Sequence, residues 1–146
     1  MSNCFDMKCP ILFKKGGKKM VAIKTLSGND VDVDDNGISL VTGPFPSDVG
    51  PHTYVYGPIA GALITSEAPQ LLISRLQTKA DFAVLKRPDN SPAWIHGPDV
   101  TEVREPLWPE TGPDINAVVM IGPLHQSVQE SVIIATQILV AHGAHL

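Results

Sequence analysis

The chain has 146 residues, 43% of them hydrophobic, which suits one ordinary folded domain. Its 13 prolines and 12 glycines indicate many turns and short elements, and exclude a simple helical bundle. Residues 1–19 hold five lysines and one aspartate, a net +4, which leaves −8 for the rest of a chain whose total is −4. A body this acidic repels phosphate backbones, and no apolar run is long enough to cross a bilayer. We therefore expect neither a nucleic acid nor a membrane as partner.

Residues 1–19 differ in character from the rest of the chain. They contain both cysteines, Cys4 and Cys9, whose spacing forms neither a zinc motif nor a redox motif. They include no apolar run of seven or more residues, so they do not resemble a secretory signal. We expect a basic, flexible leader over 1–19 and a single globular domain over 20–146, located in the cytoplasm.

The domain contains an internal sequence repeat. Shifting residues 22–51 by 62 positions places Lys24 on Lys86, Pro44 on Pro106 and Gly50-Pro51 on Gly112-Pro113. Beyond that point the second copy is three residues longer, and Gly57-Pro58 then meets Gly122-Pro123. A repeat of this length is typical of a supersecondary unit that buries its apolar face against its copy. The sequence therefore predicts an α+β fold with two tandem β-rich repeats, 21–78 and 82–142, related by pseudo-twofold symmetry.

Each repeat is expected to begin with a hairpin and continue through three more strands. In the hairpin turns, Gly28 and Asn90 can adopt positive φ. The expected strands, in chain order and by repeat, are 21–26 and 82–87, 31–33 and 93–95, 38–41 and 100–103, then 53–56 and 116–121. A Pro-rich loop precedes the last pair, and Gly-Pro pairs bracket it because proline donates no backbone hydrogen bond. Another strand then leads into the closing helix of each repeat.

The two closing helices show different start signals. In the first repeat Thr65 or Ser66 is expected to cap the helix, with Pro69 in the first turn. In the second, Ser127-Val128-Gln129-Glu130 fits a capping box, and the helix VIIATQILVA ends near Gly143. That helix is apolar nearly all round, which predicts burial between the repeats or a self-association surface.

The second repeat resembles the small flagellar and swarming-motility protein family. The resemblance covers residues 83–140 and, more weakly, residues 22–76 of the first repeat. It rests on a strand, an Asn or Gly turn, a returning strand and a closing V-x-E-S-V before a helix. Val128, Glu130, Ser131 and Val132 match that closing motif. The long Pro-rich loop and the duplication depart from the family. The resemblance implies an interaction role without catalysis.

A calcium loop is the sharpest candidate for a metal site. Asp32, Asp34 and Asn36, followed by Gly37, satisfy its D-x-D-x-N-G opening, but Gly43 stands where a bidentate glutamate is required. The simpler interpretation is a strand with alternate aspartates in water, followed by a turn. We expect no cofactor, with Ca²⁺ as the alternative.

Three histidines and two tryptophans are the remaining candidates for a ligand site. His52, His96 and His125 lie near Gly-Pro turns, where nearby carboxylates could support acid–base chemistry or metal binding. Trp94 and the proline-flanked Trp108 could line a recognition groove, although packing of Trp108 between the repeats is the favoured interpretation.

These observations favour a non-catalytic binding or assembly module of bacterial origin. Its expected partner is another protein or a second copy of itself, giving a homo-oligomer through the second helix. The alternative is a small-molecule-dependent or metal-dependent enzyme with its site between the repeats, near the Pro-rich loops.

Overall fold

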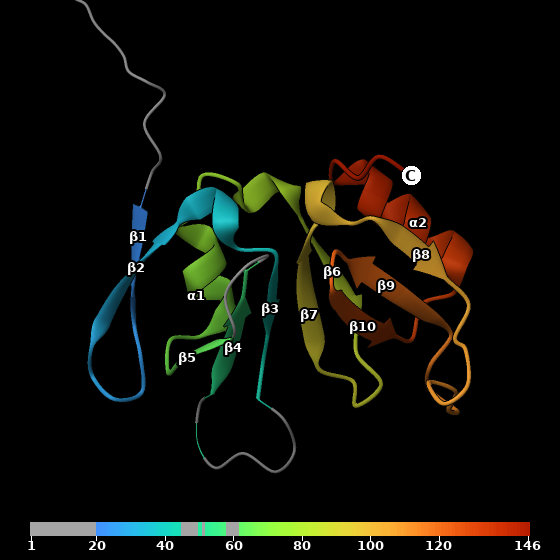
Figure 1. The fold of residues 1–146 in the computed structure, drawn as a ribbon, viewed down its shortest axis with the longest axis horizontal. Helices are drawn as coiled ribbons and strands as arrows, with labels where there is room; N and C mark the ends of the chain where they lie inside the picture. The colour runs from blue at the N-terminus through green and yellow to red at the C-terminus, as the bar shows by residue number, and fades with distance from the viewer. Residues whose placement is uncertain (1–19, 45–49, 51, 58–61) are drawn as a thin grey trace, which may run out of the picture.

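The computed structural model describes residues 20–44, 50, 52–57 and 62–146, as a mixed α+β fold (Figure 1). The expected leader, 1–19, and most of the first Pro-rich loop lie outside these residues. Short 3₁₀ turns cover Asp35–Gly37, Lys79–Asp81 and Gly97–Asp99. The strands and helices are β1 Met20–Lys24, β2 Asp30–Asp34, β3 Leu40–Thr42, β4 Thr53–Tyr56, β5 Leu63–Thr65, α1 Pro69–Ser74, β6 Phe82–Lys86, β7 Pro92–His96, β8 Glu102–Arg104, β9 Ala117–Ile121, β10 Leu124–Val128 and α2 Val132–Ala141.

The described strands form three antiparallel sheets. The central sheet has five strands in the order β5-β4-β3-β7-β6, so β3 from the first half of the chain pairs with β7 from the second. In that pairing Leu40 lies opposite Ile95, and Val41 lies opposite Trp94. The hairpin β1-β2 and the meander β10-β9-β8 form the other two sheets. The β3–β7 pair is thus the backbone connection between the two halves.

The order of elements is the same in both halves. An offset of 62 residues carries Asp30–Asp34 onto Pro92–His96, and carries Leu40–Thr42 onto Glu102–Arg104. The expected pseudo-twofold symmetry is not confirmed. A twofold axis that pairs β3 with β7 also pairs β8 with β2, whereas in the described chain β2 and β8 belong to separate sheets.

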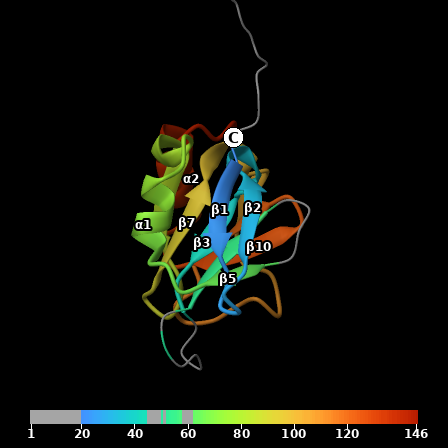
Figure 2. The same ribbon diagram turned by 90° about the vertical axis from the view of Figure 1, so that its left-hand side faces the viewer.

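Two apolar cores lie on opposite faces of the central sheet, because successive side chains of a strand point to opposite faces. Val41 and Trp94 point into the core shared with β1-β2 and α1. Leu40 and Ile95 point into the core shared with β9, β10 and α2. The hairpin β1-β2 and α1 lie next to each other at the end of the molecule that carries β5 (Figures 1 and 2). Each half therefore has its own core, with the central sheet between them.

The predicted turn residues are confirmed. Gly28 and Asn90 have φ values of 92° and 72° in the two hairpin turns, which only glycine and a few polar residues adopt readily. Gly122, at φ 59°, forms with Pro123 the tight turn that joins β9 to β10. The Gly-Pro pair in the second half therefore ends one strand and starts the next, as the sequence predicts.

Neither helix begins at its predicted cap. The residue before α1 is Ala68, which offers no side-chain cap, and the predicted cap Thr65 is instead the last residue of β5. Pro69 occupies the first turn of α1 as expected. For α2 the cap is Ser131, whose Oγ accepts from the Ile134 amide at 3.3 Å. The predicted capping box at Ser127 is wrong because pairing with β9 continues through Val128 and keeps Ser127 in β10. No helix in the described part of the chain is both long and apolar enough to span a membrane.

Gly97 allows the C-terminal end of α2 to approach the turn after β7. A Cβ at this position would collide with the backbone oxygen of His142 and would stand 3.1 Å from that of Leu139. Both obstacles are backbone atoms of the helix end, which cannot rotate away as a side chain can. The absence of a side chain at Gly97 is therefore a requirement of the packing between α2 and the central sheet.

We predict that Gly97→Ala lowers the free energy of unfolding by about 1–3 kcal/mol, the usual cost of forcing an extra methyl group into a filled space. Urea denaturation of both proteins measures the difference. The matched control is Gly43→Ala, because a Cβ at Gly43 meets no atom within 4 Å. Equal losses in the two variants would contradict the steric explanation.

Candidate functional site

His96 lies at the end of β7 where the two halves meet. Its side chain is 8% exposed, and its Nδ1 lies 2.9 Å from Asp99 Oδ2. The Ser39 hydroxyl donates to the same carboxylate oxygen at 2.7 Å. The imidazole also packs on Phe82, with ring centroids 5.1 Å apart. One residue of the first half and three of the second thus form a single polar and aromatic cluster.

The cluster does not have the geometry of a serine nucleophile with a histidine base. The Ser39 hydroxyl is bonded to a carboxylate instead of the imidazole, and Ser39 is buried. His96 Nε2 has no hydrogen-bond partner among the described residues, and the nearest carboxylate oxygen, Asp81 Oδ2, is 4.0 Å away. The cluster therefore serves to join the end of β7 to the start of β3.

The other predicted histidines have separate surroundings. His52 Nδ1 is 3.3 Å from its neighbour Gly50 O, which is a local contact. His125 lies on β10 with its Nδ1 3.7 Å from Glu110 Oε2. No three metal-ligating side chains come together in the described residues. The three histidines therefore share no partner there.

The predicted calcium ligands lie along β2 and its following turn. Asp32 is exposed on the strand, while Asp34 Oδ1 accepts from the Asn36 amide at 3.0 Å and so caps that turn. The neighbouring Asp35 is buried and accepts from the Gln77 amide at 2.8 Å. The side chains of Asp34 and Asp35 thus accept hydrogen bonds from backbone amides. The predicted turn at Asp35-Asn36-Gly37 is confirmed, whereas the burial of Asp35 against Gln77 was not indicated by the sequence.

The two tryptophans have opposite environments. Trp94 is 8% exposed and belongs to the core beneath α1. Trp108 is 86% exposed, next to the exposed Leu107, on the loop between β8 and β9. The favoured interpretation of Trp108 as packing between the halves is therefore wrong. The reason is that β3 and β7 close that gap by direct pairing.

The loop that presents Trp108 is held by an ion pair that sequence patterns did not indicate. Arg104 Nη1 and Nη2 donate to the two oxygens of Glu110 at 2.7 and 2.9 Å, and the Leu107 amide adds a third hydrogen bond at 3.0 Å. The Arg104 hydrogen bonds, followed by that of Leu107, lower the pKa of Glu110 from 4.5 to about 2. The carboxylate thus fixes the base of the loop.

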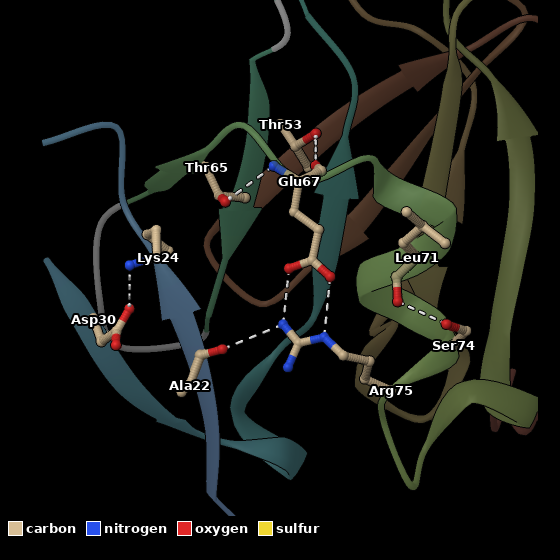
Figure 3. Close-up of polar contacts among 9 residues, drawn as sticks. All are labelled: Ala22, Lys24, Asp30, Thr53, Thr65, Glu67, Leu71, Ser74 and Arg75. Atoms are coloured by element: carbon tan, nitrogen blue, oxygen red, sulfur yellow. Dashed lines mark hydrogen bonds and ion pairs between the residues drawn. The ribbon is translucent and has the colours of Figure 1, made fainter. Parts of the chain in front are cut away.

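The outer edge of β1 is covered inside its own half. Arg75, just after α1, donates to Glu67 at 2.8 and 3.0 Å and to the backbone oxygen of Ala22 in β1 at 3.2 Å (Figure 3). Further along the same side, Thr25, directly after β1, forms a β-bridge with Thr65 of β5.

The corresponding edge of β6 is covered in a similar way. The Lys86 amide donates to the Glu130 carboxylate at 3.0 and 3.1 Å, and Lys86 O accepts from the Gln129 amide at 2.8 Å. In each half, then, residues near the end of the last strand cover the free edge of the first hairpin strand. Beside this contact lies a hollow of about 220 Å³, which is smaller than usual small-molecule sites.

Helix α2 carries the main exposed apolar surface of the second half. Only Ala135 and Leu139 are fully buried, whereas Ile133 is 71% exposed and Ile134 and Val140 are about half exposed. Of the two expectations for this helix, burial between the repeats is wrong, and a self-association surface stays a prediction. The helix packs on one face of the second half, beside β8 (Figure 1). We call Ile133, Ile134 and Val140 the outer face of α2.

No family model, curated protein or solved structure matches the chain.

We predict that Glu110→Gln lowers stability above pH 4.5 and has progressively less effect as the pH falls towards 2. A carboxylate whose pKa is lower in the folded than in the unfolded state stabilises the fold above the unfolded value, and loses that contribution as acid protonates it. Urea denaturation across this pH range measures the difference.

Glu105→Gln, on the same loop, is the matched control because its side chain is exposed. A difference between Glu110→Gln and the unmodified protein that stays constant from pH 7 to pH 2 would contradict the role of this ion pair.

Proposed function

We propose that the chain is a non-catalytic assembly module that associates with a second copy of itself through the outer face of α2. The observation that carries the proposal is the exposure of Ile133, Ile134 and Val140 on a helix with no charged residue in its ten positions. Exposed apolar patches on folded proteins commonly mark interaction sites.

A second copy is the partner that fits this surface best. The outer face of α2 offers no charge to select a partner of opposite sign, so its recognition depends mainly on apolar packing, with the exposed Gln137 as a polar neighbour. In a twofold dimer the same patch meets itself, and two such helices can interdigitate their branched side chains. Burial of Ile133 is the largest single gain, since it is the most exposed residue of the helix.

We also propose that the two halves descend from one duplicated unit joined head to tail. The support is the recurrence of β2, the following 3₁₀ turn and β3 at a constant offset of 62 residues. In each half, a residue near the end of the last strand also contacts the first strand of the hairpin, Thr65 in one half and Gln129 in the other. Each unit then consists of a hairpin, a three-stranded meander and a closing helix.

Other parts of the proposal rest on the sequence alone. These are a bacterial origin, action in the cytoplasm and a motility-related context. The alternative, an enzyme with its site near the Pro-rich loops, gains no support from the His96 cluster. That cluster lies at the opposite end of the β3–β7 pair from Thr42, which leads into the first Pro-rich loop.

We predict that Ile133→Lys shifts the protein from dimer to monomer, because the ammonium group cannot be buried in an apolar contact without a partner. Size-exclusion chromatography with light scattering, from low to high micromolar protein, measures the mass against the 15.6 kDa of one chain.

The matched control is Leu71→Lys, a similarly exposed apolar residue on α1. It is expected to leave the dimer intact. A monomeric unmodified protein at the highest concentration would dismiss self-association through α2.

A further inference from the structure

The junction between the halves is built from side chains that point away from each unit's own core. Leu40 of β3 enters the core of the second half, and Trp94 of β7 and Phe82 of β6 enter the core of the first. All three are buried. Each unit thus extends apolar residues into its neighbour, in addition to the backbone pairing of β3 with β7.

The corresponding positions at the two ends of the molecule have different residues. At the offset of 62, Leu40 corresponds to Glu102 of β8, Trp94 to Asp32 of β2, and Phe82 to Met20 of β1. Glu102, Asp32 and Met20 are all exposed. In the described chain β2 pairs only with β1, and β8 only with β9. Each terminal strand therefore presents the same kind of edge as a junction strand, with a carboxylate where the junction has a large apolar side chain.

A head-to-tail junction has no inherent limit. Because it uses a different edge on each unit, its repetition generates a ring or a filament unless something stops it. Terminal units of repeat proteins commonly have a polar outer face, and charged side chains on edge strands prevent edge-to-edge pairing. Glu102 and Asp32 are placed where such a stop is needed.

We infer that β2 and β8 are the two mating edges of the same head-to-tail junction, and that Asp32 and Glu102 limit the assembly to the two units of one chain. The inference depends on the proposed duplication and is independent of association through α2. In the register of the β3–β7 pair, β8 of one chain meets β2 of the next with Val103 opposite Asp32. Asp32 then occupies the place of Trp94 and its carboxylate is forced into an apolar core, which is strongly unfavourable.

Glu102 opposes the same contact from the other side. In that register it lies opposite Val33, as Leu40 lies opposite Ile95 within the chain. Leu40 fills space in the neighbouring core, whereas the Glu102 carboxylate loses its hydration there without gaining a partner. The two carboxylates therefore act on the two sides of one contact, and both must be replaced to restore it.

The experiment transfers the junction residues to the open edges. We make Asp32→Trp with Glu102→Leu, in a background that also carries Ile133→Lys so that α2 does not contribute to assembly. Light scattering over a range of protein concentrations is expected to show the mass rising from one chain to two or more. The control, Asp32→Asn with Glu102→Gln in the same background, is expected to stay at the mass of one chain, because Asn and Gln lack the apolar volume of Trp94 and Leu40.

Three outcomes would overturn the inference. In the first, the Asp32→Trp/Glu102→Leu protein folds, as judged by its circular dichroism, and still runs as a single chain. In the second, the Ile133→Lys background protein already forms higher assemblies. The third applies if the double variant does not fold. The Asp32→Trp and Glu102→Leu proteins are then mixed, so that the changed β2 of one can meet the changed β8 of the other, and a mixture that stays at the mass of one chain contradicts the inference.

Discussion

The pairing of β3 with β7 is the interaction on which the rest of the structure depends. It joins strands from the two halves into one central sheet, with Val41 opposite Trp94 on one face and Leu40 opposite Ile95 on the other. Because a strand alternates its side chains between two faces, this one pair contributes to both cores. The polar cluster of Ser39, His96 and Asp99 closes the same pair at one end. Removing this pairing would leave two sheet edges and two partly open cores.

The two halves show how similar elements can carry different surfaces. β3 is buried, whereas β8, 62 residues further on, has an exposed residue, Glu102, followed by the partly buried Val103 and Arg104. The same contrast separates β7, which is mostly buried, from β2, with its row of aspartates. The difference is that β3 and β7 pair with each other inside the central sheet, whereas β2 and β8 lie at the edges of their sheets. The acidic row that resembles half a calcium loop is thus placed where an edge strand is exposed to water.

Much of the fold could be predicted from local sequence signals. The hairpins, the positive φ of Gly28 and Asn90, and the order of strands and helices follow from turn residues and alternation, which act within a few residues. The helix caps could not be predicted in this way. Pairing with β9 extends β10 through Val128, and the cap of α2 therefore falls at Ser131. The exposure of Trp108 and Ile133 also depends on long-range packing. Similarly, nothing in the spacing of Arg104 and Glu110 indicates that their side chains meet.

The placement of Trp94 and Phe82 in the first core has a consequence for the order in which the protein is made. A chain emerging from the ribosome usually folds one complete unit at a time, beginning at its N-terminus. Here the first half lacks part of its interior until residue 94 has been synthesised. The second interior in turn requires Ala144, which follows α2. Folding during synthesis therefore cannot finish the first half before most of the hairpin of the second has emerged.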